Sequence, residues 1–148
     1  MFGPSTIGWY GPFYQNFHHA EDKKIFQIAS LELVRNTVRC RDIYGLPIVG
    51  FDLAGAEDGY PAKHHKESFN YAHRNFLKKT VHAGEAYGPE SIFDAITSLH
   101  ADRIGHGYHL FSPERCLPGQ RISNDDYTRK LINYIADRRI TIEVCISS

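Results

Sequence analysis

The sequence has no excess of charge of either sign. Its 148 residues contain 17 Lys and Arg against 17 Asp and Glu, so the formal net charge is zero. A basic surface for nucleic acid or an anionic membrane is therefore not indicated. The sequence also lacks an apolar run long enough to span a membrane, and residues 1–13 lack the basic start and apolar core of a signal peptide. We expect neither nucleic acid nor a membrane as a partner.

Cysteine is scarce, and its spacing excludes two kinds of small protein. The three cysteines, Cys40, Cys116 and Cys145, are far apart, and an odd number cannot all pair within one chain. No C-x-x-C pair is present, which argues against a ribbon-type zinc site and against a disulfide framework. The composition instead favours a cytoplasmic protein with reduced, buried thiols.

The length and the composition are those of one globular domain. Hydrophobic residues make up 42% of the chain and charged residues 23%, which is typical of a folded protein rather than a disordered one. We expect residues 1–21 to form an irregular segment rich in aromatic residues and glycine, and residues 22–148 to form the domain. The aromatic residues of the first segment are more typical of packing than of base stacking, since no basic residues lie between them.

From residue 22 onward, helical and strand patterns alternate. Helices are expected over 22–44 and 64–78, from Gly88-Pro89-Glu90, and from a capping box at Ser123 and Asp126, with strands over 48–55, 79–83, 103–105 and 141–146. Among the residues expected on the apolar helix faces are Phe69, Ala72, Phe76, Ile92, Phe93 and Ile96. Repeated β/α units with right-handed crossovers predict an α/β fold with a parallel sheet.

Four such units fit two architectures. They could form a small doubly wound domain or part of an eight-stranded barrel. A complete (β/α)₈ barrel typically needs about 250 residues, so the chain is too short for a whole one. We therefore expect about four parallel β/α units, either as a small domain or as a partial TIM barrel.

Candidate catalytic residues follow two of the expected strands. Val81-His82-Ala83-Gly84-Glu85 places a histidine at a strand end and a carboxylate three residues later, and Gly105-His106-Gly107 follows the next strand. In parallel β/α folds the active site lies beyond the carboxyl ends of the strands. A metal ligand, a proton-transfer carboxylate and a second imidazole would suit metal-assisted hydrolysis.

Each motif has a simpler interpretation when it is taken alone. An H-x-x-E spacing often arises by chance, and a histidine between two glycines is commonly a water-exposed turn residue. Tyr108 and His109 are expected to be structural. The remaining polar groups, His18-His19, His64-His65, Glu57 and Asp58, are expected at the solvated surface.

Four segments, taken together and in order, closely resemble the adenosine deaminase family of zinc-dependent purine deaminases. They are Phe51-Asp52-Leu53-Ala54-Gly55, Val81-His82-Ala83-Gly84-Glu85, Arg103 to His109, and Glu143 to Ser148. The ordered set covers roughly residues 22–148 and is far more specific than any one member. The Gly105-His106-Gly107 form is similar to that of adenosine deaminases, whereas related adenine deaminases tend to carry an aspartate before that histidine.

The resemblance implies a role for each matching residue. His82 matches a zinc ligand, and Glu85 matches the carboxylic acid that passes a proton to N1 of the purine. His106 matches the imidazole beside the attacking water, and Gly55 matches a glycine whose N–H meets the purine at N3. The implied reaction is the hydrolytic loss of ammonia at C6, which turns adenosine into inosine.

The sequence also departs from the family pattern. The family takes two further zinc ligands from a His-x-His pair after the first strand, and no such triplet precedes Asp52. A fourth ligand, an aspartate after the eighth strand, would lie beyond Ser148, and Ala56 stands where an acidic residue is common. The resemblance therefore implies a fragment with barrel strands four to seven, one zinc ligand of four and an incomplete site.

Three functional hypotheses remain open from the sequence. The first is a zinc-dependent adenosine deaminase whose remaining ligands lie outside this chain, with a purine nucleoside as substrate. The second is a non-catalytic half-barrel that binds or assembles, with self-association through open barrel edges. The third is a deaminase of another purine, although Gly105 argues against adenine as the substrate.

Overall fold

A computed structural model describes residues 22–118 and 122–146, so the expected irregular segment 1–21 lies outside the described residues. The helices are α2 (Asp22–Asp42), α3 (Lys66–Arg74), α4 (Pro89–Ser98) and α5 (Asn124–Arg138), with short 3₁₀ turns at Ala62–His65, Tyr108–Phe111 and Pro113–Arg115. The strands are β1 (Gly50–Leu53), β2 (Lys78–Ala83), β3 (Arg103–His106) and β4 (Thr141–Glu143). None of the described helices is long and apolar enough to cross a membrane.

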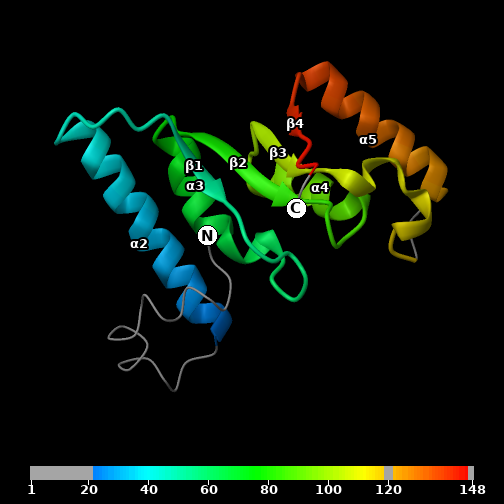
Figure 1. The fold of residues 1–148 in the computed structure, drawn as a ribbon, viewed down its shortest axis with the longest axis horizontal. Coiled ribbons are helices and arrows are strands. Elements are labelled where there is room, and N and C mark those ends of the chain that lie inside the picture. Colours follow the sequence, from blue (N-terminus) through cyan, green and yellow to red (C-terminus); the bar gives the residue numbers. More distant parts are fainter. Residues whose placement is uncertain (1–21, 119–121, 147–148) are drawn as a thin grey trace.

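The four strands form one parallel sheet in the order β1-β2-β3-β4. A helix precedes or follows each strand along the chain (Figure 1). This arrangement confirms the predicted α/β fold of about four parallel units. β1 and β4 are shorter than expected, and β4 ends at Glu143 rather than near residue 146, whereas β2 and β3 are each one residue longer than expected.

Two helix starts follow from local sequence. Gly88 precedes α4 in an extended conformation and Pro89 opens it, where a missing N–H leaves no intrahelical bond unmade. Ser123 caps α5, because its hydroxyl accepts a hydrogen bond from the N–H of Asp126 at 3.2 Å. Both starts were predicted from the sequence.

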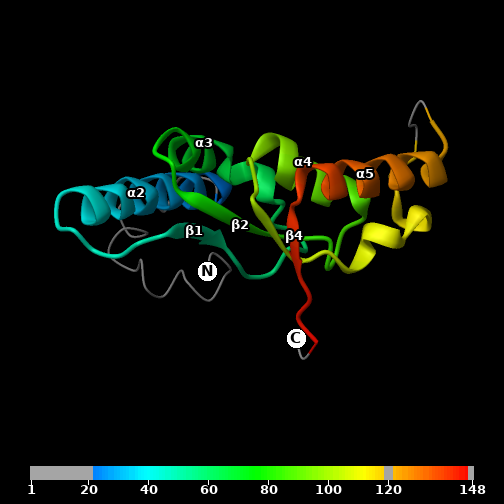
Figure 2. The same ribbon diagram turned by 90° about the horizontal axis from the view of Figure 1, so that it is seen from above.

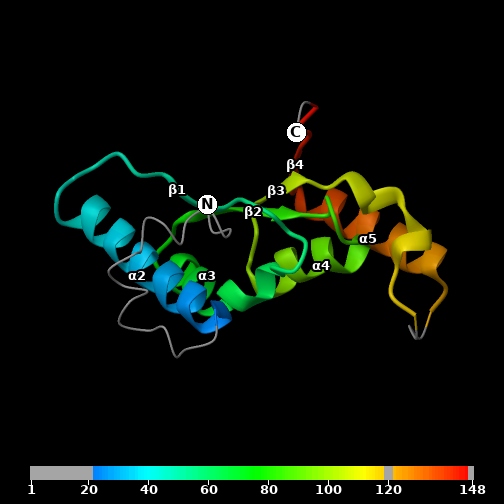
Figure 3. The ribbon, with the colours of Figure 1, turned by 60° about the horizontal axis from the view of Figure 1, so that its bottom comes forward.

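All four helices lie on one side of the sheet (Figures 2 and 3). The strand residues facing them are mostly apolar and buried, with Phe51, Leu53, Val81, Ala83 and Ile104 forming a core with helix residues such as Phe69, Ile92 and Leu131. The alternate residues point to the opposite face, where polar side chains such as Asp52, Thr80 and His82 lie. This is the arrangement of part of a (β/α)₈ barrel, in which the second face would line the interior.

Two aromatic residues are not buried as the helical periodicity predicted. Phe76 is 92% exposed, because α3 ends at Arg74 and Phe76 takes a left-handed φ of 60° beyond it. Phe93 is 37% exposed, although its ring makes edge contacts with Tyr127 and Tyr134 of α5. Helical periodicity cannot locate a residue that lies past the end of its helix.

The amino-terminal end of the sheet is held by a buried lysine. The Lys79 side chain is 4% exposed, and its ammonium group donates to Asp102 at 2.8 Å and to the Leu77 carbonyl at 3.0 Å. The backbone N–H of Lys79 also donates to the Asp102 carboxylate at 2.9 Å. Burial acts to raise the pKa of Asp102, but the hydrogen bonds from Lys79 outweigh it and lower that pKa.

Replacing this carboxylate should destabilise the chain in a pH-dependent way. Asp102→Asn leaves the buried ammonium without its counter-ion, and we expect a loss of about 1–3 kcal/mol in the free energy of unfolding at pH 7. Because the folded pKa of Asp102 is lowered, its contribution is present above the unfolded value of about 3.9 and is lost as the pH falls below it.

Urea unfolding from pH 7 to pH 3 measures this difference against the wild type. Asp137→Asn, on an exposed position of α5, is the matched control and should change little at any pH. A deficit in Asp102→Asn that stays constant down to pH 3 would contradict the assignment.

Candidate active site

The pairing of β2 with β3 brings the two predicted histidine motifs together. Val81, His82 and Ala83 pair with Ile104, Gly105 and His106, in that order. The ladder continues past the strand ends, since the N–H of Gly107 donates to the Ala83 carbonyl and that of His109 to the Gly84 carbonyl, each at 3.0 Å. The two following loops therefore leave the same edge of the sheet side by side.

His82, Glu85 and His106 converge at this edge. The carboxylate of Glu85 lies 2.9 Å from Nε2 of His82 and 3.8 Å from Nδ1 of His106. The two imidazole rings are 4.4 Å apart, centroid to centroid. The structure thus groups three of the four residues predicted for the site.

A strained backbone turns His106 toward His82. By strand alternation the side chain of His106 would follow Ile104 toward the helices, but His106 has a left-handed φ of 70°. This conformation costs a non-glycine residue about 1–3 kcal/mol and is enriched at functional sites. Tyr108 supports the turn, with its ring edge against His106 and its hydroxyl donating to the Cys145 carbonyl.

The two imidazoles present unsatisfied nitrogens to one point. Nε2 of His82 and Nδ1 of His106 are buried and lack a hydrogen-bond partner in the described structure. The Glu85 carboxylate lies 2.9 Å from Nε2 of His82, a close contact that is not a hydrogen bond. Buried nitrogens of this kind are normally paired or bound to a metal.

These donors fit a metal ion. One atom from each of His82, Glu85 and His106 lies within 4.8 Å of the other two. Imidazole nitrogen with carboxylate oxygen is a ligand set typical of zinc. Among residues 22–118 and 122–146 this is the one cluster of three such groups, and it supplies fewer than the four ligands that zinc usually takes.

Gly55 lies beside this cluster. It has a left-handed φ of 125° in the loop after β1. Together with Ala54, Glu57 and His82 it lines a small cavity of about 20 Å³. The fourth predicted residue therefore borders the same region as His82.

Glu57 is buried, whereas the sequence predicted it at the solvated surface. It is 5% exposed, and its carboxylate accepts four hydrogen bonds from the loop after β2 and one from α4. The donors are the backbone N–H groups of Gly84 at 2.9 Å, Glu85 at 3.0 Å, Ala86 at 2.7 Å and Tyr87 at 3.2 Å, and the Ser91 hydroxyl at 2.5 Å. Burial acts to raise the pKa of Glu57, but these hydrogen bonds outweigh it and lower that pKa.

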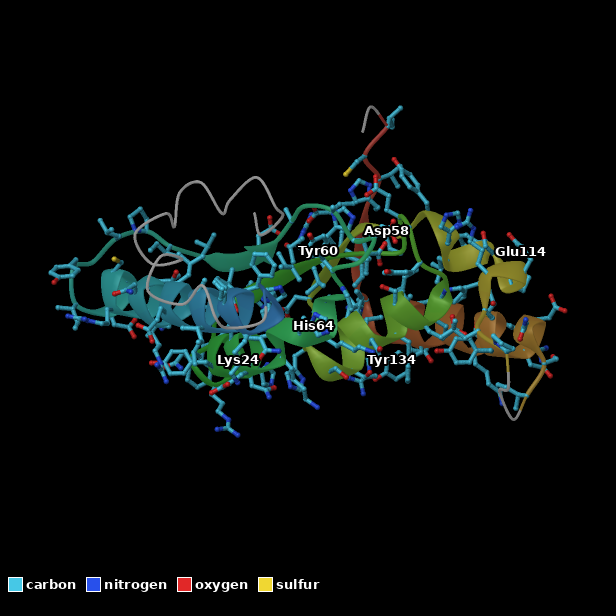
Figure 4. The ribbon with its side chains drawn as sticks, turned by 90° about the horizontal axis from the view of Figure 1, so that it is seen from below. Lys24, Asp58, Tyr60, His64, Glu114 and Tyr134 are labelled. Atoms are coloured by element: carbon cyan, nitrogen blue, oxygen red, sulfur yellow. The ribbon has the colours of Figure 1, made fainter. Side chains whose placement is uncertain are left out.

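His65 was also wrongly expected at the surface. It is 5% exposed at the end of the turn Ala62–His65 and borders the same small cavity as His82. Burial lowers the pKa of His65 to about 4, so the imidazole is neutral at pH 7. Figure 4 shows that its neighbour His64 lies on the helical layer, away from the loop carrying Asp58.

Comparison with known proteins identifies the family of this chain. The family model described as adenosine deaminase matches residues 20–148. The chain belongs to the adenosine deaminase family. It is 40% identical over 121 residues to adenosine deaminase 1 of Streptomyces coelicolor, covering 80% of this chain and 28% of that protein. It is 39% identical over 119 residues to an adenosine deaminase of Mycobacterium sp. (strain KMS), covering 80% of this chain and 31% of the relative.

The chain thus spans about a third of the length of the curated relatives it matches. Among solved structures, the adenine deaminase from Arthrobacter aurescens is similar with a TM-score of 0.60 and 22% identity. The similarity covers 80% of this chain and 31% of that one. At this identity the comparison shows the fold alone, and it agrees with a partial barrel.

Gly84 is required where the two site loops touch. Its φ is 77°, and a Cβ added there would lie 2.7 Å from side-chain atoms of the fully buried Ile92 and 3.3 Å from the Cα of Gly107. Gly59 has almost the same φ, 76°, but no atom lies within 4 Å of its added Cβ. Comparing an alanine substitution at Gly84 with one at Gly59 therefore separates the cost of backbone strain from the cost of steric overlap.

We expect Gly84→Ala to destabilise the chain by about 1–3 kcal/mol more than Gly59→Ala. Both variants incur the left-handed strain of about 1–2 kcal/mol, and only Gly84→Ala must also displace a packed isoleucine. Urea denaturation of both variants measures the difference. Equal losses would show that the loops have room for a methyl group at residue 84.

Proposed function

We propose that this chain carries part of the active site of an adenosine deaminase-like enzyme, with the site incomplete in the chain itself. The observation that carries the proposal is the convergence of His82, Glu85 and His106 at the ends of β2 and β3. Membership of the adenosine deaminase family supports the reaction class, hydrolytic deamination of adenosine to inosine and ammonia. Zinc as the metal and a purine nucleoside as the substrate are part of this proposal.

Glu85 is proposed as the proton donor. Attack of water at C6 builds negative charge on the purine ring, and a carboxylic acid that protonates N1 neutralises it. Glu85 is about one-third exposed and lies between two imidazoles, so it faces the point at which the cluster converges. Completion of the pocket would exclude water from the point at which Glu85 meets the ring.

Gly55 and His106 are proposed to orient the reactants. The N–H of Gly55 would donate to N3 of the purine, and its left-handed φ is compatible with a close approach of the backbone to a ring. His106 would hold the attacking water in line with C6. Its strained backbone keeps the ring beside His82, so little reorganisation is needed when the substrate binds.

His82 is proposed as the metal ligand of this chain. Its Nε2 is buried, makes no hydrogen bond in the described structure and lies 2.9 Å from a Glu85 carboxylate oxygen. Zinc, when bound, supplies a water of lowered pKa at neutral pH. The sequence contains no His-x-His triplet that could add the family's further imidazole ligands, so these ligands would come from another polypeptide segment.

A second candidate function is assembly without catalysis, and the bare face of the sheet favours it. No described helix covers this face, and large apolar side chains are exposed near both edge strands, including Val49 at 83% and Ile146 at 94%. Unpaired strand edges commonly associate with another strand. We propose that a complementary polypeptide or a second copy of the chain closes these edges. We also propose that the protein acts in the cytoplasm.

A deaminase of another purine is less well supported. A side chain at Gly105 would stand beside His82, since a Cβ there would lie 3.5 Å from the His82 Cα. Gly105 therefore leaves room next to the proposed ligand that the aspartate of adenine deaminases would occupy. This difference favours the nucleoside adenosine over free adenine.

A hybrid protein tests the proposal. The matching segment of the Streptomyces coelicolor relative would be replaced by the corresponding residues of this chain, and inosine formation would be followed by ultraviolet absorbance with zinc present. We expect the hybrid to deaminate adenosine and the chain alone to show no turnover above a zinc blank. Glu85→Gln should lower the rate of the hybrid by about 10²–10⁴-fold, the usual contribution of a proton donor.

Glu114→Gln, on an exposed turn, is the matched control and should leave the rate unchanged. A folded, zinc-loaded hybrid that leaves adenosine intact would favour the assembly role. Efficient turnover by the monomeric chain would contradict the incomplete site.

A further inference from the structure

The carboxylate of Glu57 connects two loops that carry separate parts of the proposed site. Glu57 lies two residues after Gly55, in the loop that follows β1. Its five donors all belong to residues 84–91, which include Glu85 and the start of α4. The carboxylate therefore ties the backbone beside Gly55 to the backbone of Glu85.

The hydrogen-bond pattern requires an ionised carboxylate. Oε1 accepts from Gly84 and Ser91, and Oε2 accepts from Glu85, Ala86 and Tyr87. Four donors are backbone N–H groups, which cannot become acceptors. No lone pair is thus left to face a ligand, and Glu57 is not among the residues that could hold a metal.

Further contacts hold the same loop from both sides. The Tyr87 hydroxyl accepts from the N–H of Gly59 at 2.8 Å, and Arg115 donates to the Ala86 carbonyl at 3.3 Å. These groups are exposed, whereas Glu57 is buried. Hydrogen bonds to a buried charge are the stronger kind, so Glu57 contributes most to holding the loop.

We infer that Glu57 is a positioning residue for Glu85. It holds residues 84–87 in the one conformation in which the Glu85 side chain lies between His82 and His106. Because Gly55 and Glu85 would contact N3 and N1 of the same ring, Glu57 also fixes the distance between the two loops that would bind the purine. This second part rests on the proposed function, whereas the positioning of Glu85 does not.

Glu57→Gln tests this inference directly, because it keeps the shape of the side chain but disrupts the pattern of hydrogen bonds that the carboxylate accepts. The amide group places an NH₂ donor where one carboxylate oxygen was, opposite at least one backbone N–H. The least costly orientation puts NH₂ at the Oε1 position, where Ser91 can turn to accept but Gly84 cannot. The residue next to Glu85 then loses its anchor.

Co²⁺ binding to the whole chain provides a readout independent of catalysis. Its visible absorption reports on the geometry of a metal ion held by His82, with Glu85 and His106 as the further groups of the cluster that could bind it in the chain alone. We expect Glu57→Gln to weaken Co²⁺ binding by about 10–100-fold and to change the spectrum, as loss of a residue supporting metal ligands typically does. The matched control Glu114→Gln, remote from the loop of Asp58 and Tyr60 in Figure 4, should behave as the wild type.

Proton–nitrogen NMR of the same samples follows the loop itself. We expect the amide signals of residues 84–87 and the ring-proton signals of His82 and His106 to shift in Glu57→Gln and not in the control. Unchanged ring signals, or an unchanged Co²⁺ affinity and spectrum, would overturn the inference. If Glu57→Gln does not fold, Ser91→Ala removes one donor, should shift the same signals in a folded chain, and overturns the inference if it does not.

The failure of the proposed function has a different signature. A wild-type chain that binds no Co²⁺ would count against the metal site. In that case the ring-proton signals alone decide whether Glu57 positions Glu85, with the same two outcomes.

Discussion

The parallel pairing of β2 with β3 brings the two histidine motifs of the site together. It sets His82 opposite Gly105 and Ala83 opposite His106, so both histidine motifs end at one edge of the sheet. A slip of one residue would turn His82 toward the helices and leave Val81 on the bare face. The buried Val81 and Ile104, each inaccessible to solvent, oppose such a slip. The hydrophobic core thus determines the geometry of the polar cluster.

The sequence predicted the sheet, the helices and the cluster, but not what holds the cluster in place. Helix and strand periodicities depend on residues close together in sequence, and each site motif directly follows a strand. The elements and the motifs can therefore both be predicted from neighbouring residues. The partners of Glu57 lie 27–34 residues away in sequence. Four of the five are backbone groups, which leave no mark in the side-chain sequence. An isolated Glu-Asp pair in a glycine-containing loop therefore resembles a solvated turn until the fold is known.

His65 and Phe76 illustrate the same limit at shorter range. His65 lies next to His64 in a polar stretch, and only the packing of its turn beneath the loop after β1 buries it. Phe76 continues the apolar spacing of α3, but the helix ends two residues earlier. Periodicity specifies neither the packing of a turn, which buries His65, nor the end of a helix, which exposes Phe76.

The groups that join the two site loops all belong to residues 57–115, within the described part of the chain. This part of the site therefore forms on a sheet whose described helices all lie on one face. The chain spans about a third of the length of its curated relatives, and its described residues supply fewer than the four ligands that zinc usually takes. Under the proposed function, catalysis would need the face that no described helix covers to be closed. The convergence of His82, Glu85 and His106 does not depend on that closure.

The central proposal is that His82, and no cysteine, binds the metal at this cluster. X-ray absorption at the zinc edge, on the chain loaded with one equivalent of Zn²⁺, tests it directly. The account predicts nitrogen and oxygen neighbours at about 2.0–2.2 Å with imidazole scattering that weakens in His82→Ala. A sulfur neighbour at about 2.3 Å, or a spectrum unaltered by His82→Ala, would contradict it.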